Sequence, residues 1–306
     1  MDRDEQWVSS DERPVIPGRG GADTYKTMQP TSTKLITRWA DAEPIRVEDE
    51  LVVEEPLEIR VGQQPLIVVM RTPGHDFELA AGFLYTESLI TASDDIEIIA
   101  YCEENGSDTQ DPEVSSFENI VNVQLREALT LDEQSGWQRN FHANTSCGLC
   151  GKMTIESVRQ QVSPVKSGFR LNQGVLYRLN DRLRKAQSVF EKTGGLHAAG
   201  LFNAEGELLI VREDIGRHNA VDKVIGQALL SDLVPLERHV LMVSGRASFE
   251  IVQKALFARI PIVVAVSAAS TLAVDLAEEG NLTLIGFMRG RRMAVYSCPE
   301  RVSREM

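Results

Sequence analysis

The clearest hydrophobic pattern lies in the C-terminal half of the chain, where short apolar runs alternate with amphipathic segments. The runs 239–244, 261–267 and 282–288 are rich in β-branched residues and almost wholly apolar, which is typical of strands buried on both faces. Between them, residues 248–259 and 270–279 show the three- and four-residue apolar spacing of helices. Strands and helices that alternate in this way predict right-handed βαβ units and a parallel sheet.

The segments before this alternation complete the predicted sheet. Apolar positions recur every three or four residues over 173–192, which predicts an amphipathic helix ended by Gly194 and Gly195. The runs "HAAGLF" and "ELLIVRED", separated by "NAEG", predict a β-hairpin. A further helix is marked by five apolar residues: Val221, Val224, Ile225, Ala228 and Leu229. Residues 166–306 are therefore predicted to form a three-layer α/β/α sandwich around a mixed sheet of about five strands.

The N-terminal half has a weaker pattern. Residues 1–33 lack periodicity and are rich in Gly, Pro, Ser, Thr and charge, so they are predicted to be a disordered leader. From Ala42 to Arg71, extended apolar runs broken by "VGQQP" predict antiparallel strands joined by a tight turn. "HDFELAAGFLYTES" predicts a helix and "ENIVNVQL" a further strand. We therefore expect a small α+β domain over residues 34–140, followed by a mobile linker over 141–165.

Composition narrows the class of protein. A chain of 306 residues with 42% hydrophobic and 25% charged residues is long enough for two globular domains or one large one. The sequence has no apolar run of the roughly 18 residues that a membrane helix needs, and its N-terminus lacks the apolar segment of a secretory signal. Four cysteines are too few for a disulfide framework. We therefore expect a cytoplasmic protein with no membrane partner.

The charge of the chain argues against one large class of partners. A formal net charge of −13 lacks the basic footprint of nucleic-acid-binding proteins, so no nucleic acid is expected. The acidity is uneven, because nine Asp or Glu residues and no Lys or Arg lie between Ala92 and Asn119. Such a run is typical of a solvated loop, and a docking surface for a basic partner is the alternative.

The predicted parallel strands also indicate where a ligand binds. Ligands of open α/β sheets bind beyond the carboxyl ends of the strands, and these ends read "SGR", "SAAS" and "FMRGRR". Glycines, small hydroxyls and arginines suit phosphate or pyrophosphate. The alternative is that Ser244 and Ser270 cap helices, that the arginines are solvated and that Phe287 completes the core. The candidate ligand-binding residues at these ends are Ser244, Gly245, Arg246, Phe287, Met288, Arg289, Gly290, Arg291 and Arg292.

A second candidate cluster lies in "REDIGRHN". Arg217 and His218 follow a predicted strand and begin a predicted helix, a position from which they could line the same cleft. Structural hydrogen bonds at the start of the helix are an equally good explanation of both residues. Glu213 and Asp214 are expected to orient Arg217.

The segment "TSCGLCGK" holds two of the four cysteines, Cys147 and Cys150. A structural zinc site usually needs two such pairs, and only one is present, so no metal is expected. A thioredoxin-like redox pair would lie between a strand and a helix of a βαβ unit, whereas this pair lies in the predicted linker. The remaining hypothesis is a nucleophilic thiol, with backbone freedom from Gly148 and Gly151 and a thiolate favoured by Lys152.

Several segments together resemble the FdhD family of formate dehydrogenase accessory sulfurtransferases. They are "TPGHDFELAAGFLYTE", "SCGLCGK", "GGLHAAGLF", "REDIGRHNAVDKVIG", "VSGRASFEIVQKA" and "FMRGRR". The resemblance runs from about residue 42 to the C-terminus, and "REDIGRHNAVDK" is its most specific part. It implies a cytidine-deaminase-like fold for the C-terminal domain.

The resemblance also implies a function. Cys147 would accept sulfur from a cysteine desulfurase as a persulfide, with Cys150 as its helper. The sulfur would pass to the bis-guanylyl molybdenum or tungsten cofactor before that cofactor enters formate dehydrogenase, and the protein would be a homodimer. The "FMRGRR" segment and the "SGR" turn would then bind a guanine nucleotide diphosphate moiety of the cofactor. A chaperone that binds the cofactor without covalent sulfur chemistry is the alternative function.

The deaminase-like fold raises the question of deamination, and the residues argue against it. Zinc deaminases use H-x-E followed by P-C-x-x-C, in which the Glu transfers protons. Here His197 is followed by Ala198 and Ala199, so the Glu is missing. The cysteine pair precedes this histidine and follows Ser146 rather than a proline. A deaminase-like scaffold without deaminase activity is therefore expected.

Overall fold

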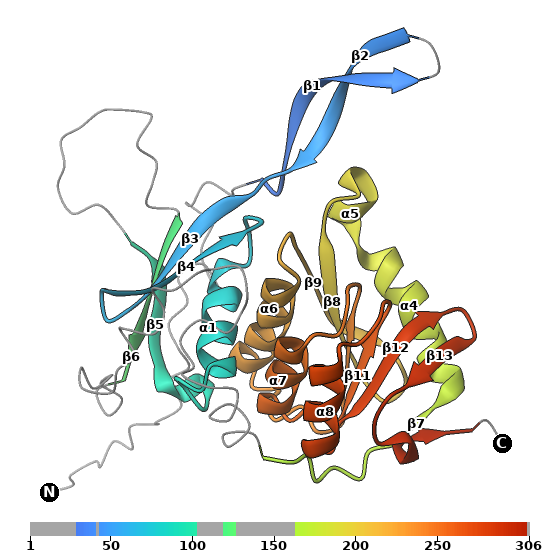
Figure 1. The fold of residues 1–306 in the computed structure, drawn as a ribbon. Helices are drawn as coiled ribbons and strands as arrows, with labels where there is room; N and C mark the ends of the chain where they lie inside the picture. Colours follow the sequence, from blue (N-terminus) through green and yellow to red (C-terminus); the bar gives the residue numbers. More distant parts are fainter. Residues whose placement is uncertain (1–28, 41–42, 103–118, 127–162, 305–306) are drawn as a thin grey trace, which may run out of the picture.

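The computed structural model of the chain describes residues 29–40, 43–102, 119–126 and 163–304. Its described part is a mixed α/β protein with two main sheets, one covered by helices on both faces and the other backed by a single helix, and a two-stranded arm that projects from the body (Figure 1). None of the helices in these ranges is long and apolar enough to cross a membrane. The segment that holds Cys147 and Cys150 lies outside the described residues.

The C-terminal sheet has six strands in the order β13-β12-β11-β10-β8-β9. The predicted hairpin and the three predicted parallel strands, β10, β11 and β12, are confirmed. The sixth strand, β13, is not among the predicted strands. The polar "FMRGRR" segment, which ends at the first residue of β13, predicts a loop. The bounds are β8 His197–Phe202, β9 Leu208–Asp214, β10 Val240–Val243, β11 Ile262–Ala265, β12 Thr283–Arg289 and β13 Arg292–Val295.

Helices cover both faces of this sheet, so the predicted three-layer arrangement is confirmed. Alternate strand residues face opposite layers: one set packs against α6, α7 and α8, and the other packs against α4. The resemblance to a cytidine deaminase stays a prediction. The helices are α4 Gln173–Ala186, α5 Ser188–Thr193, α6 Arg217–Leu230, α7 Phe249–Phe257 and α8 Thr271–Glu279, and a short ladder joins β7 (Leu171–Asn172) to β14 (Val302–Ser303).

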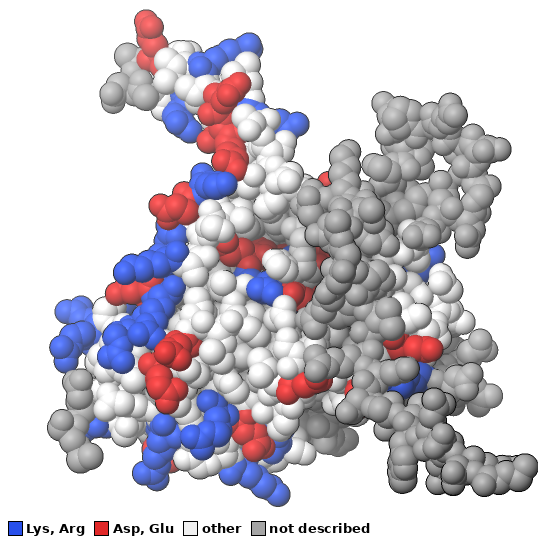
Figure 2. Space-filling model, turned by 180° about the vertical axis from the view of Figure 1, so that it is seen from behind, with Lys and Arg blue, Asp and Glu red and all other residues white. Residues whose placement is uncertain are grey.

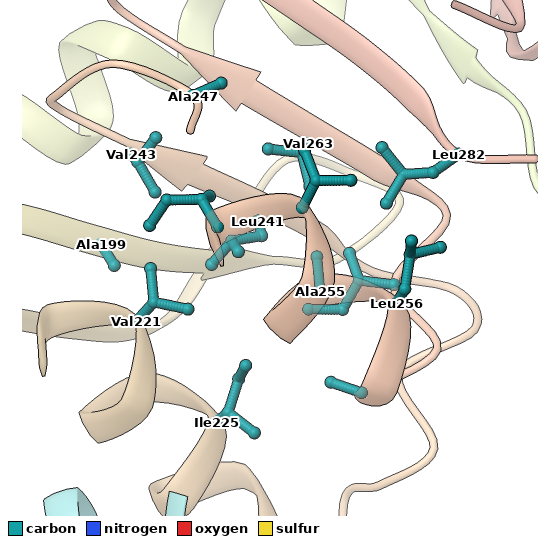
Figure 3. Close-up of a cluster of buried hydrophobic side chains, with 14 of the residues drawn as sticks. Ala199, Val221, Ile225, Leu241, Val243, Ala247, Ala255, Leu256, Val263 and Leu282 are labelled. Atoms are coloured by element: carbon teal, nitrogen blue, oxygen red, sulfur yellow. The ribbon is translucent and has the colours of Figure 1, made fainter. Parts of the chain in front are cut away.

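The core between the sheet and α6 and α7 shows why the strands are so apolar. Ala199, Leu241, Val243 and Val263 project from three neighbouring strands toward the helices (Figure 3). The opposing residues, Val221, Ile225, Ala255 and Leu256, come from the apolar faces of α6 and α7. Because the alternate strand residues are buried against α4, the strands have no polar face.

The single helix predicted over 173–192 is wrong, because the structure divides it at Gln187. α4 begins at its N-cap Asn172, whose side chain accepts a hydrogen bond from the Gly174 N–H at 2.7 Å. Gln187 has a non-helical backbone, and its side chain is buried. The Glu213 carboxylate accepts hydrogen bonds from the N–H groups of Val189 and Phe190, at 2.9 and 2.8 Å, and so starts α5 anew.

The N-terminal sheet has four strands in the order β4-β3-β6-β5, backed by helix α1. The predicted tight turn is confirmed at Gly62 and Gln63, which both have positive φ values, 56° and 71°. The predicted solvated loop is wrong over residues 96–101, which form β5 with Ile96 and Ile99 fully buried. The bounds are β3 Glu55–Val61, β4 Gln64–Arg71, α1 Asp76–Thr86, β5 Ile96–Tyr101 and β6 Ile120–Leu125.

The two-stranded arm consists of β1 Thr31–Ala40 and β2 Glu43–Val52, paired in antiparallel register. β2 falls within the predicted strands, whereas β1 does not, and the predicted disordered leader is wrong over residues 31–33, which begin β1. In Figure 1 the arm projects from the start of β3 and extends beyond α5, away from the body.

The N-terminal and C-terminal halves are joined by close packing of α1 on α6. The two helices cross at Gly82 and Gly226, where a β-carbon on either residue would overlap a carbonyl group of the other helix. Buried ion pairs reinforce the joint: Lys254 lies 2.9 Å from Asp222, which also accepts a hydrogen bond from Thr86 of α1 at 2.8 Å. The two halves therefore form one packed body in spite of their separate sheets.

Candidate functional site

The carboxyl ends of the three parallel strands meet at one edge of the sheet, as predicted. The Ser267 N–H donates to the Gly245 carbonyl at 3.3 Å, and the Phe287 N–H donates to the Ser267 carbonyl at 3.0 Å. Ser270 caps α8, because its Oγ accepts from the Ala273 N–H at 3.3 Å. Ser244 does not cap a helix, since its Oγ accepts from the Ala198 N–H at 2.9 Å and ties β10 to β8.

Gly245 lets two cationic or titratable side chains approach this edge. A β-carbon there would lie 3.3 Å from His197 Nδ1 and 3.8 Å from Arg217 Cδ. The Arg217 Nε is buried and has no hydrogen-bond partner within the described part of the chain. His197, the first residue of β8, and Arg217, the first residue of α6, therefore meet the strand ends at Gly245. The Arg217 guanidinium keeps a donor there that a ligand can use.

The positive charge of this place comes from arginines rather than histidines. Burial lowers the pKa of His197, and the charges of Arg217 and Arg246 lower it further. Burial also lowers the pKa of His218 to about 4, with a further contribution from Arg217. Both imidazoles are therefore neutral at pH 7, whereas the guanidinium groups of Arg217 and Arg246 stay charged. The site suits an anion that accepts hydrogen bonds.

His218 lies beside Ser248 and Glu250, but the three do not form a catalytic triad. Its Nε2 lies 3.1 Å from Ser248 Oγ and 3.7 Å from Glu250 Oε2, so both partners are on the same ring nitrogen. In a triad the acid holds Nδ1 while Nε2 activates the nucleophile. With a pKa of about 4, His218 is also a weak base. These contacts support the structural explanation of His218.

The prediction that Glu213 and Asp214 orient Arg217 is wrong. Glu213 caps α5, and the fully buried Asp214 forms an ion pair with Lys223 Nζ at 2.7 Å. Asp214 also accepts hydrogen bonds from the N–H groups of Thr72 and Gly216, at 3.2 and 2.7 Å. Much of "REDIGRHNAVDK" therefore holds the two halves together rather than lining the cleft.

A cavity of about 450 Å³ opens beside this edge, between α4, α5 and the sheet. His197 and Ser244 connect it to the strand ends, and Arg184 and Phe190 contribute a cation and an aromatic ring, stacked at 4.6 Å. The sequence did not predict the wall that α4 and α5 form. The "GGLH" segment, whose four residues line the cavity, was the one local pattern that could have indicated a site here. The cavity is lined by Asn180, Leu183, Arg184, Gln187, Phe190, Gly194, Gly195, Leu196, His197, Ser244 and Val266.

The "FMRGRR" segment forms the turn between β12 and β13. Phe287 has a φ of 52° and is 50% exposed, so the alternative that it completes the core is wrong. Met288 is fully buried, side chain and backbone together, so neither is open to a ligand in this structure. Arg291 stacks over Tyr177 of α4, with 5.9 Å from its guanidinium carbon to the ring centroid. Seen from behind in Figure 2, Lys and Arg side chains gather along the side that holds α4 and this turn.

The described cysteines are poor candidates for sulfur chemistry. Cys102 and Cys298 are free thiols, and burial raises the pKa of Cys298, which disfavours its thiolate. The described ranges contain no cluster of three His, Cys, Asp or Glu residues that could hold a metal. The roles predicted for Cys147 and Cys150 stay predictions, because both lie outside these ranges.

Comparison with known proteins adds independent evidence on the family of this chain. The profile of the FdhD/NarQ family matches residues 52–303. The chain is 48% identical to the sulfur carrier protein FdhD of Streptomyces avermitilis, over 89% of this chain and 96% of that protein. It is 51% identical to the protein of the same name from Nocardia farcinica, over 89% and 95%. The protein of that name from Saccharolobus solfataricus is 39% identical, over 87% and 96%.

One solved structure has the same fold. It is a crystal structure from Desulfotalea psychrophila, assigned as a formate dehydrogenase accessory protein. It superposes with a TM-score of 0.70, covers 90% of this chain and 100% of its own, and is 22% identical. At this identity the likeness shows the fold alone.

Proposed function

The chain belongs to the FdhD/NarQ family, and on that premise we propose that it is a sulfur carrier required for formate dehydrogenase activity. The observation that carries the proposal is 48% identity, over 89% of the chain, to a protein named as a sulfur carrier. The anion-suited edge beside Gly245 and Arg217 supports it, because a sulfur carrier must hold the acceptor of its sulfur. Within this proposal the protein is a sulfurtransferase that works in the cytoplasm.

The loading step uses Cys147. Its thiolate attacks the terminal sulfur of a persulfide on a cysteine desulfurase. A new S–S bond forms on Cys147 while the S–S bond of the donor breaks, and the electron pair leaves with the donor's cysteine as a thiolate. Cys150, three residues away, exchanges with or protects the loaded sulfur. The terminal sulfur is the cargo for the next step.

The acceptor is the bis-guanylyl molybdenum or tungsten cofactor, bound as a substrate and later inserted into formate dehydrogenase. Its guanine nucleotide diphosphate parts would bind at the strand ends, where Ser244, Gly245 and Arg246 meet Phe287. The buried Arg217 Nε is a donor suited to phosphate oxygen, and the backbone at Gly290 and the guanidinium groups of Arg289, Arg291 and Arg292 extend the basic surface toward α4.

A cofactor-binding chaperone is the second candidate function, favoured by the fact that the described residues alone already form a cleft suited to an anion. The two functions differ in one measurement: the intact mass of the protein after incubation with a cysteine desulfurase and cysteine. A gain of one sulfur atom that a thiol reductant removes supports the carrier. An unchanged mass, under conditions in which the desulfurase itself carries a persulfide, supports the chaperone.

The basic turn gives a prediction about ligand binding. Replacing Arg291 and Arg292 with alanine is expected to weaken GDP binding at least about tenfold, because each charge-assisted contact to phosphate contributes about 1.5–3 kcal/mol. The salt dependence of binding should flatten in the same variant. Calorimetry on both proteins measures both effects.

The matched control replaces two exposed arginines away from this turn, Arg126 after β6 and Arg238 before the amino end of β10, and so removes the same charge. Its GDP affinity should stay within about twofold of wild type, since distant surface charges are screened by salt. Equal weakening in the two double variants would mean that net charge, and not this turn, determines binding.

The proposal includes protein partners. A cysteine desulfurase supplies the sulfur, formate dehydrogenase receives the sulfurated cofactor, and the chain acts as a homodimer. The formate dehydrogenase link is supported by membership of the family, because the resemblance to that family implies an accessory role for this enzyme.

A further inference from the structure

The arm exposes an unusual amount of apolar surface. Trp39 is 74% exposed and Leu35 is 61% exposed, and Ile45 and Leu51 are also among the exposed large hydrophobic residues. A two-stranded ribbon alone is only marginally stable in water, and both of its edges leave backbone groups free to pair. Figure 2 shows the arm standing clear of the described body. The arm therefore has the character of an interaction element.

The register places these residues on both faces of the ribbon. Trp39 is paired with Pro44 and Leu35 with Glu48, so Trp39, Pro44 and Leu35 share one face. Ile45 and Leu51 are paired with Arg38 and Ser32 and belong to the other face. An arm that folded back on its own body would cover only one of these faces, whereas an arm held against another protein chain can cover both.

A cavity with one apolar side and one polar side lies at the base of the same arm. Its volume is about 260 Å³, and Pro30, the residue before β1, is in its wall. His75, with its Nδ1 3.2 Å from Glu78, contributes to the polar rim. The apolar part of the wall consists of Pro30, Pro73, Val189, Leu196 and Val211. Such a wall suits a tryptophan, because the apolar side can pack against the indole ring and the polar side can accept from the indole N–H.

The positions of tip and base fit a symmetric dimer. Ten residues per strand give the arm a length of about 30 Å. If two arms lie antiparallel about a twofold axis, the tip of each arm reaches the base of the other. Trp39 and Pro44 of one copy then meet the cavity that contains Pro30 and Val189 of the second copy, and the second apolar face is covered by the other arm.

The charges of the arm suit the same arrangement. Arg46 is exposed near the tip, whereas Glu48, Glu50 and Glu54 are nearer the base of β2. Antiparallel arms bring the tip arginine of one copy to the acidic base of the other. Such pairs fix the register of an interface and disfavour the parallel alternative, in which like charges would meet.

We infer that the β1–β2 arms of two copies exchange, with Trp39 of each copy seated in the cavity at the base of the partner arm. The inference rests on the homodimer of the proposed function and names its interface. It also gives the dimer a part in the site, because Leu196 lines both this cavity and the cavity beside His197. The tip of the partner arm would thus lie at the rim of the ligand-binding edge.

Sedimentation velocity over a range of concentrations tests the inference on the full chain. Trp39→Ser on the arm and Val189→Arg on the cavity wall should each raise the dimer dissociation constant at least about 30-fold, as expected for a residue at the centre of an interface. Val68→Ser is the control, because Val68 is an exposed apolar residue on β4, away from the arm, and its replacement should leave the constant unchanged. Circular dichroism verifies that each variant is folded.

Two results would overturn the inference. One is a wild-type protein that stays monomeric at all concentrations, which would also remove the proposed homodimer. The other is a dimer that neither Trp39→Ser nor Val189→Arg weakens, which would leave the homodimer intact and reject this interface. Neither result bears on sulfur loading, which the intact mass measures separately.

Discussion

Replacing Cys147 with alanine is expected to abolish sulfur loading by a cysteine desulfurase. The reason is chemical, because the persulfide needs a thiolate as nucleophile and alanine has none. The change is expected to cost well under 1 kcal/mol of unfolding free energy, because the glycine-flanked sequence around Cys147 predicts a linker rather than a packed core. Intact mass after incubation with desulfurase and cysteine, together with an unfolding curve, measures both effects.

The other cysteines are the controls for this experiment. Cys150→Ala should reduce sulfur transfer less than Cys147→Ala, since only one thiol must present the persulfide. Cys298→Ala should load normally, because burial raises the pKa of this thiol and its Sγ is 3.5 Å from Asn281 Oδ1. Full loading of the Cys147→Ala protein would contradict the carrier role. Equal and complete loss in both pair mutants would favour a shared metal or a disulfide cycle.

Replacing Gly226 with alanine is expected to destabilise the protein by about 3 kcal/mol or more, at the upper end of overpacking effects. A methyl group there would overlap the carbonyl oxygen of Glu78, which is backbone of α1 and cannot move unless the whole helix moves. In an unobstructed helix the same change would stabilise by up to about 1 kcal/mol. The sign of the effect in chemical denaturation therefore tests whether α1 and α6 cross as closely as the structure shows.

Gly168→Ala is the matched control for the helix crossing. A β-carbon at Gly168 would have no neighbour within 4 Å. The unfolding free energy of the Gly168→Ala protein should therefore stay within about 0.5 kcal/mol of wild type. Gly82→Ala, on the other side of the crossing, should behave like Gly226→Ala, because its β-carbon would overlap the Asp222 carbonyl. A Gly226→Ala protein as stable as wild type would mean that the helices are farther apart.

The sequence by itself was enough to predict the parallel strands of the central sheet and the edge at which their carboxyl ends meet. Buried β-branched runs separated by amphipathic helices allow almost one topology, because crossover connections are right-handed and short. That topology placed Ser244–Arg246 and Phe287 at one edge, and the hydrogen bonds through Ser267 confirm it. Local patterns were sufficient for this prediction, because the order of the strands determines which residues meet at the edge.

The tertiary structure alone decided which residues of a motif do which work. "REDIGRHNAVDK" is one continuous segment, yet Asp214 and Lys223 are buried against Thr72, while Arg217 lies beside Gly245 and its Nε has no partner among the described residues. The helical wall of the cavity and the division of the helix at Gln187 also escaped prediction. The physical reason is that periodicity shows which face of an element is buried but not what buries it, since partners distant in sequence meet only in the folded chain.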